Sequence, residues 1–231
     1  GGLRNSTYVR HGTESRKSRD VLERSRSNSE AEPGTSRESR GAKTRERIVV
    51  AAAEAFADVG YNGINLNDVV VGLDLTKGAL YYFFPTKEAL VVEIVRRHFE
   101  LFAAVGEAAL SQSDNRLDAF VELTYQVGRL FQHNPITRAG ARLTNERNVI
   151  NADLPRPFVG WIDRITQLLR QAKRRGELRA DVRPKEIAEL VVSFFFGAQT
   201  ISNEFHQRKD LLVRLDRFWA LVLPSLRPEA P

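Results

Sequence analysis

The sequence predicts an all-α fold, and three observations support this prediction. From Ala42 onward, apolar residues recur at three- and four-residue spacing, which is the period of an amphipathic helix. No segment shows the apolar–polar alternation of a half-buried strand. The chain has 231 residues and is 42% hydrophobic, which is enough to build a core from helices. Cysteine is absent, so disulfides, thiol nucleophiles and thiolate metal sites are excluded.

Residues 1–41 form a region of different composition. Serine occurs eight times, arginine often lies beside it, and large apolar side chains are scarce. Such a segment buries too little apolar surface to offset its ordering entropy, so we predict a disordered Ser/Arg-rich extension over 1–41. It has no apolar run typical of a secretory signal, and no later stretch is apolar over the length that a membrane span requires.

The first predicted helix carries apolar residues at helical spacing from Ile48 to Val59. It ends at Gly60, because glycine readily adopts the left-handed conformation that commonly follows a helix. Asn65 is a candidate N-cap for a short second helix, with Asp68 as its capping-box partner.

A second short helix is predicted from about residue 76 to residue 83, and the run from Pro85 opens a long helix after it. Two short helices within 65–84, held between longer ones, have the anatomy of a helix-turn-helix. In that motif the second short helix enters the major groove of DNA. The sequence therefore predicts a DNA-binding domain over 42–88.

The predicted helix over 76–83 carries residue types suited to DNA. Thr76 and Lys77 place a hydroxyl and a cation at its N-terminus, where backbone N–H groups also attract phosphate. Gly78 and Ala79 are small, so the backbone can approach base edges, and the adjacent tyrosine hydroxyls can reach phosphates. The alternative is a helical hairpin with core aromatics and solvated lysines. The predicted DNA-contacting residues are Lys43, Arg45, Thr76, Lys77, Gly78, Ala79, Tyr81, Tyr82 and Lys87.

The net charge of +6 allows an anionic partner but does not identify one. Residues 41–97 carry seven basic and seven acidic side chains, so the predicted DNA-binding region is neutral. Phosphate affinity is then expected to depend on Lys43, Arg45 and Arg47. The extension before them is open to two interpretations, a phosphate-contacting arm or a solvated tail. The motif, and not the bulk charge, carries the nucleic-acid prediction.

Further helices are predicted over 115–133, 136–149 and 156–176, followed by two strongly apolar helices. One of these last two holds residues from Ile187 to Ile201, and the other holds residues from Leu211 to Val222. They complete a second predicted domain over 89–231, for ligand binding and dimerisation.

The run Thr76 to Leu90, with the sequence TKGALYYFFPTKEAL, closely resembles the signature of TetR-type repressors. The resemblance implies a TetR-like fold, with an N-terminal helix-turn-helix domain, a larger helical ligand domain and a cytoplasmic homodimer that binds double-stranded operator DNA. Two positions depart from the family pattern. Asp74 stands in the turn where glycine is usual, and it is expected to adopt a left-handed backbone at modest cost. Phe83 replaces a usual histidine, so a phosphate contact is lost.

The second half resembles one branch of that family, the γ-butyrolactone-type signalling receptors. The resemblance rests on RAGARL at 138–143, on Pro157-Phe158 followed by Trp161, and on FFGAQ at 195–199. It implies a repressor of secondary-metabolism genes, released from DNA by a small, largely apolar autoregulator of the lactone, butenolide or alkylfuran type. The resemblance implies these ligand-binding residues: Phe99, Thr144, Phe158, Trp161, Ser193, Phe194 and Gln199.

These residues are mostly neutral, which favours an uncharged lactone over a carboxylate unless an arginine such as Arg142 or Arg147 faces the ligand. A ligand that wedges against the helix over 86–108 is expected to shift it and to separate the two recognition helices of a dimer. The two C-terminal apolar helices are expected to form the dimer interface.

Other function classes fit the sequence less well. The four histidines lie far apart and no catalytic or dinucleotide motif occurs, so we expect no enzyme activity, no catalytic residue, no metal and no cofactor. Basic residues around Lys173 could face a membrane, but they bracket a helix end at Gly176, where cations are favoured. We therefore expect no membrane partner. A TetR-type regulator of efflux or catabolism, a ligand-blind regulator and an activator stay open as alternatives.

Overall fold

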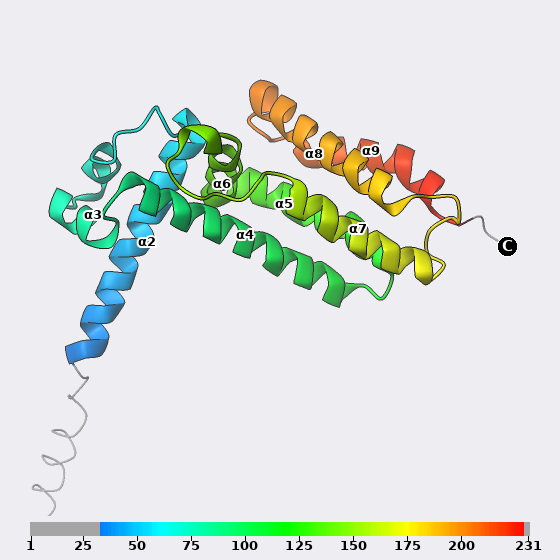
Figure 1. Cartoon of the computed structure of the whole chain (residues 1–231), viewed down its shortest axis with the longest axis horizontal. Coiled ribbons are helices and arrows are strands. Elements are labelled where there is room, and N and C mark those ends of the chain that lie inside the picture. Colours follow the sequence, from blue (N-terminus) through cyan, green and yellow to red (C-terminus); the bar gives the residue numbers. More distant parts are fainter. Residues whose placement is uncertain (1–32, 229–231) are drawn as a thin grey trace, which may run out of the picture. The chain divides into compact units, whose positions relative to one another are not determined.

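The described part of the chain folds into helices. The computed structural model of the protein describes residues 33–228, with side chains from residue 39 onward. None of these residues lies in a β-strand, so the predicted all-α fold is confirmed (Figure 1). The elements are α2 (Pro33–Val59), η1 (Asp68–Leu73), α3 (Lys77–Phe83), α4 (Lys87–Gln112), α5 (Arg116–His133), α6 (Pro135–Asn145), η2 (Arg147–Val149), α7 (Val159–Arg174), α8 (Pro184–His206) and α9 (Leu211–Leu226).

Helix α2 begins at Pro33, earlier than the start at Ala42 that the sequence suggested. Residues 33–41 are therefore helical, in contrast to the predicted disorder. Extending an existing helix gains one hydrogen bond for each residue that is fixed, and proline is tolerated in a first turn. Residues 1–32, the rest of the predicted extension, lie outside the described residues. The chain divides into two units, residues 1–45 and residues 46–231.

Within residues 46–231, one hydrophobic core joins the end of α2, η1, α3 and the first half of α4 with α6. Phe56 of α2, Leu80 of α3, Leu90 of α4 and Leu143 of α6 are all fully buried in this core. The helix-turn-helix therefore shares one core with α6, an element of the predicted ligand domain.

The turn between η1 and α3 depends on Asp74, whose φ of 52° and ψ of 36° lie in the left-handed region. This confirms the expectation that an aspartate can replace the usual glycine there. The predicted capping box at Asn65 is wrong. Asn65 Oδ1 accepts the Asn67 N–H at 3.0 Å, so this side chain closes a local turn, and η1 starts at Asp68 as a 3₁₀ helix without a side-chain cap.

A second core is built around α5, which packs against α4, α6, α7, α8 and α9 (Figure 1). Phe120 of α5 and Leu215 of α9 are buried in it, and the Trp219 Nε1–H donates to Thr124 Oγ1 at 2.9 Å. Phe102 of α4 joins this second core. The domain boundary predicted after residue 88 therefore falls at the start of α4, which supplies side chains to both cores.

The helices expected over 115–133, 136–149 and 156–176 are present with small shifts. The second is broken at Glu146 into α6 and η2, and the third starts only after Phe158. Phe158 has a φ of +69°, an uncommon backbone conformation for an aromatic residue. Its ring packs edge-on against Phe196 with centroids 4.5 Å apart, so the surrounding packing fixes this strained residue.

Candidate functional site

The exposed face of α3 presents most of the residues predicted to contact DNA. Leu80 holds the helix in the first core, whereas Lys77, Gly78 and Tyr81 are exposed and Tyr82 is 81% exposed. Aromatic side chains with this exposure are not part of a core. The hairpin alternative therefore does not account for the two tyrosines, although it does account for Phe83, which packs against the core.

The first turn of α3 is open to close approach. Thr76 Oγ1 accepts the Ala79 N–H at 3.1 Å, which leaves the hydrogen of the Thr76 hydroxyl available to an incoming acceptor. A Cβ added at Gly78 would have only Thr76 Oγ1 within 4 Å, at 3.8 Å. A hydroxyl, a cation and bare backbone thus lie together at one helix N-terminus.

Lys87 does not take the phosphate-facing position that the sequence suggested. Its ammonium donates to the backbone carbonyls of Tyr61 and Ile64 and lies 4.1 Å from the centroid of the Tyr61 ring. Burial lowers the pKa of Lys87, an effect partly opposed by the neighbouring Glu88 carboxylate. Lys87 therefore organises the loop before η1, and we leave it out of the DNA-contacting set.

The neighbouring Tyr61 hydroxyl donates to Glu88. Burial, followed by this hydrogen bond and the carboxylate charge, raises the pKa of Tyr61 to about 12. The same hydrogen bond lowers the pKa of Glu88. Both groups thus keep their usual protonation states at neutral pH and hold the start of α4 against the loop before η1.

Of the basic residues before the helix-turn-helix, Arg47 has a structural role. Its guanidinium donates to the Leu73 carbonyl at 2.7 Å, at the last residue of η1. Lys43 and Arg45 lie on α2 within the unit 1–45, where Lys43 is exposed and Arg45 is half-buried. Their contact with phosphate stays a prediction.

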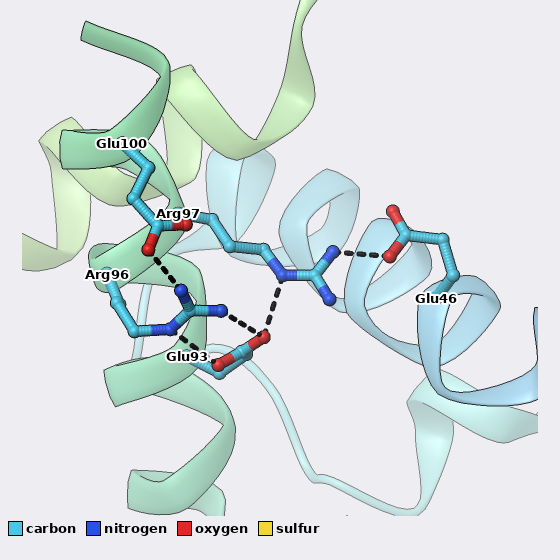
Figure 2. A network of polar contacts seen from close by, with 5 residues as sticks. All are labelled: Glu46, Glu93, Arg96, Arg97 and Glu100. Carbon is cyan, nitrogen blue, oxygen red and sulfur yellow. Dashed lines mark hydrogen bonds and ion pairs between the residues drawn. The ribbon is translucent and has the colours of Figure 1, made fainter. Parts of the chain in front are cut away.

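An ionic network joins α2 to α4 (Figure 2). The buried Glu93 carboxylate accepts from Arg96 Nε and Nη2 at 3.0 and 2.9 Å, and from Arg97 Nε at 2.7 Å. Arg97 also pairs with Glu46 of α2, and Arg96 pairs with Glu100. Because Arg97 bonds to carboxylates on two helices, it fixes α4 against the segment of α2 that starts at Glu46.

A second polar contact ties the end of α2 to α6. Arg142 Nη1 donates to the Ala57 and Asp58 carbonyls at 3.1 and 2.8 Å, and Arg142 Nε pairs with Glu146 at 2.9 Å. Glu146 in turn accepts the Tyr61 N–H at 2.7 Å. Arg142 therefore caps the C-terminus of α2, where carbonyls lack helical partners, and it is not free to face a ligand.

A mainly apolar cavity of about 300 Å³ lies between α4, α5 and α7. We call it the main cavity. Its α4 wall includes the small residues Ala103, Gly106 and Ala109, and a Cβ added at Gly106 would meet no atom within 4 Å. Polar groups occur along one side of α7. The lining residues are Phe99, Phe102, Ala103, Gly106, Ala109, Leu110, Ala119, Leu123, Gly160, Trp161, Arg164, Ile165, Gln167, Leu168 and Gln171.

The predicted ligand residues fall into two groups. Phe99 and Trp161 line the main cavity, and they also line a smaller hollow of about 20 Å³ together with Thr144 and Phe158. We call this smaller space the His98 hollow, after the histidine in its wall. Ser193, Phe194 and Gln199 line neither space. Ser193 is exposed, the Phe194 ring stacks on Phe218 of α9, and Gln199 bonds to Thr200.

His98 is a residue that sequence reasoning did not assign to the ligand site. It is 4% exposed, and its Nδ1 has no hydrogen-bond partner among the described residues. Burial lowers the pKa of His98 to about 4, although a backbone hydrogen bond at Thr137 acts in the opposite direction. His98 is therefore neutral at pH 7.

Part of the missed lining could have been found from sequence spacing. Ala103, Gly106 and Ala109 recur every three residues on α4, and small residues on one helix face leave room beside them. The polar side chains at Arg164, Gln167 and Gln171 follow helical spacing in the same way. Nothing in the sequence, however, indicated that the α4 and α7 faces oppose each other.

Two family models match the chain. Residues 48–94 match the bacterial regulatory proteins of the tetR family, and residues 114–228 match the tetracyclin repressor-like C-terminal domain. Within the described residues no group of three or more metal-ligating side chains occurs, and none of their helices has the length and apolar character of a membrane span.

Several known proteins are similar to the chain. The A-factor receptor protein of Streptomyces griseus is 30% identical over 190 residues, and the match spans 82% of this chain and 66% of that protein. A solved structure on the control of antibiotic production by bacterial hormones is 38% identical, over 80% of this chain and 98% of that one, with a TM-score of 0.72. A γ-butyrolactone receptor structure is 27% identical, over 82% and 90%, with a TM-score of 0.68.

Acid should destabilise the fold through His98. Because the folded pKa of about 4 lies below the usual value, the unfolded chain binds the proton first, and stability falls as the pH drops below about 6.5. We expect His98 to contribute a loss of about 2 kcal/mol in unfolding free energy between pH 7 and pH 5. Urea unfolding of the wild type and of His98→Asn at both pH values measures this difference. Equal losses in the two proteins would contradict the assignment.

Proposed function

The chain belongs to the TetR family of bacterial regulatory proteins, and from that premise we propose that it is a transcriptional repressor released from operator DNA by a small, largely apolar signalling molecule. The observation that carries this proposal is that α4 lies under the helix-turn-helix at one end and lines the main cavity at the other. The relatives are regulators and receptors rather than enzymes, and the proposed place of action is the cytoplasm.

On the DNA side, α3 is the proposed recognition helix. Lys77 and the Thr76 hydroxyl supply phosphate contacts, and the small Gly78 lets the backbone approach base edges. Tyr81 and Tyr82 reach flanking phosphates. Because the region is neutral overall, few charges support the complex, so its stability should depend on the close fit of this one helix.

On the ligand side, the main cavity has the size and apolar character of a small-molecule site. Trp161 and Phe99 line both the main cavity and the His98 hollow. The charged side chain in the lining is Arg164, which is exposed on α7. A lactone, butenolide or alkylfuran with a hydrocarbon chain matches this lining, and the receptor-like relatives support the same class.

Release follows from the shared helix. A ligand in the main cavity presses on α4, and α4 is fixed to α2 by Arg97 and packs on α6. A shift of α4 therefore moves the helix-turn-helix. In a dimer that reads two half-sites at fixed spacing, such a shift breaks the register with DNA. Genes of secondary metabolism are the proposed targets.

The dimer is proposed to form through α8 and α9. Both helices carry large apolar side chains that are exposed in the single chain, among them Leu190 and Ile201 of α8 and Leu221 of α9. Pairing these surfaces across a two-fold axis would bury them in a four-helix contact.

A methyl group at position 78 should weaken operator binding without harming the fold. Gly78→Ala adds a Cβ in open space on an exposed helix, so stability should be unchanged or slightly higher. The same methyl group intrudes between α3 and the bases, and we expect roughly a tenfold loss of affinity. Fluorescence anisotropy with a DNA duplex selected from a random library measures this affinity.

Gly106→Ala is the matched control, because it also adds a Cβ in open space on a helix but lies in the cavity wall. Its operator affinity should equal that of the wild type. If Gly78→Ala binds the selected duplex as tightly as this control does, α3 is not the recognition helix.

Filling the main cavity should block release and spare DNA binding. Gly106→Leu places a branched side chain in the open space beside α4, so we expect at least a tenfold higher concentration of 2-octyl-γ-butyrolactone for half-release. Ala104→Leu, an exposed change on the same helix, should leave release unaltered. Mobility shifts with titrated lactone test this, and coinciding release curves for both variants would place the ligand elsewhere.

A further inference from the structure

The start of α7 has an unusual backbone. Phe158, its N-cap residue, has a φ of 69° and a ψ of −31°, and the Val159 N–H donates to the Pro157 carbonyl at 2.9 Å. These are the features of a γ-turn with a positive φ at its central residue, which is a rare and strained conformation. Glycine adopts a positive φ readily, whereas an aromatic residue does so at a cost.

Local sequence preference does not account for this turn. The N-cap residues of α3, α4, α5 and α6 are extended, and the side chain of each accepts a hydrogen bond from the backbone of its own helix. Phe158 forms no such bond, so α7 begins with neither a side-chain cap nor a relaxed backbone. Packing fixes the conformation instead, because the Phe158 ring lies against Phe196 of α8. Strain that tertiary packing imposes in this way is concentrated at active sites, ligand clamps and switch regions.

The segment before Phe158 is anchored in the core of the helix-turn-helix. Ile150 and Leu154 are buried in that core, whereas Phe158 packs against the second core. Two of the three residues between Leu154 and Phe158 are prolines, Pro155 and Pro157, whose rings fix φ and stiffen the connection. A short, stiff connection of this kind passes a displacement of the start of α7 on to Leu154.

The segment after Phe158 lines the main cavity. Gly160 and Trp161, in the first turn of α7, are among its lining residues, and the Trp161 ring lies edge-on to Phe102 of α4 with centroids 4.6 Å apart. The Ile162 N–H donates to the Phe158 carbonyl at 2.9 Å, which ties this turn to the strained residue. A ligand that contacts Trp161 therefore acts on the first turn of α7 and, through it, on Phe158.

We infer that Phe158 is a positioning residue for release from DNA, because its backbone is strained in one of the two arrangements of the molecule and relaxed in the other. Phe158 thereby couples ligand contact at Trp161 to the position of Leu154 in the core of the helix-turn-helix. This coupling runs through the loop between α6 and α7 and adds to the coupling through α4. The inference rests on the proposed function, since it assumes that a ligand in the main cavity releases the protein from DNA.

A comparison of Phe158→Gly with Phe158→Ala isolates the strain. Both variants lack the ring, but glycine adopts a positive φ freely and alanine does not. Relieving strain that only one arrangement carries shifts the balance between the two arrangements. We therefore expect the concentration of 2-octyl-γ-butyrolactone for half-release from the selected duplex to differ at least threefold between these variants. Mobility shifts with titrated lactone on the full chain measure this difference.

Val159→Gly and Val159→Ala are the matched control pair. Val159 is exposed, is the first residue of α7 and has a negative φ, so exchanging glycine and alanine there relieves no strain. The release curves of this pair should agree within twofold. Urea unfolding supplies a second readout, in which Phe158→Gly should be more stable than Phe158→Ala, and Val159→Gly less stable than Val159→Ala. Cooperative unfolding and binding of the duplex without lactone show that each variant is folded.

Three results would overturn the inference. If the release curves of Phe158→Gly and Phe158→Ala coincide while their stabilities differ, the strain is equal in both arrangements and has only a structural role. If Phe158→Gly is no more stable than Phe158→Ala, Phe158 carries no strain. If the Val159 pair differs in release as much as the Phe158 pair does, strain is not the cause. Failure of the proposed function is distinct from all three, because the lactone would then not release the wild type either.

Discussion

Helix α4 supplies side chains to both hydrophobic cores, and the rest of the structure depends on this sharing. Leu90 and Ile94, in its first half, lie in the core of the helix-turn-helix, while Phe102 and Ala109 lie in the core built around α5. A helix fixed by close packing at both ends transmits a displacement along its length, because packed interiors do not deform continuously. The main cavity lies beside the second half of this helix.

Two polar contacts connect α2 to the helices around it, one to α4 and the other to α6. Arg97 joins Glu93 of α4 to Glu46 of α2, and because Arg97 and Glu93 are only 19% and 10% exposed, their pair is screened less than a surface ion pair. Arg142 caps the C-terminus of α2 from α6. These contacts join α2, α4 and α6 to one another. A ligand that contacts the α4 side or the α6 side of the His98 hollow therefore acts on helices that share a core with the helix-turn-helix. The ligand changes the affinity for DNA only if it binds the DNA-binding arrangement and the released arrangement of the helices with different affinity.

Much of the fold followed from local sequence signals. The left-handed turn at Asp74 and the helix end at Gly60 each depend on a residue's own backbone preference, which the sequence displays directly. The capping box predicted at Asn65 was wrong because this side chain can accept a hydrogen bond either from a helix end or from the residue two positions later. Composition does not decide between these two bonds. The start of α2 was misplaced because a helix can extend, one hydrogen bond for each residue fixed, without an apolar pattern.

The site was harder to predict, because it depends on contacts between distant segments. The sequence predicts an exposed cation at Lys87, but its ammonium donates to the Tyr61 and Ile64 carbonyls in the loop after α2. His98 is buried because Gly140 of α6, which has no side chain, lies against it, and this contact between distant segments is not visible in the sequence. Ser193 and Gln199, taken from the family resemblance, lie on α8 and line neither cavity, whereas Trp161 and Phe99 line both.

The central claim is that cavity occupancy and DNA binding exclude one another through α4. Calorimetric titration of 2-octyl-γ-butyrolactone into the free protein and into its complex with the selected duplex measures this coupling. We expect the duplex to weaken lactone binding by the same factor by which the lactone weakens duplex binding, because the coupling is reciprocal. Equal lactone affinity with and without the duplex would contradict it.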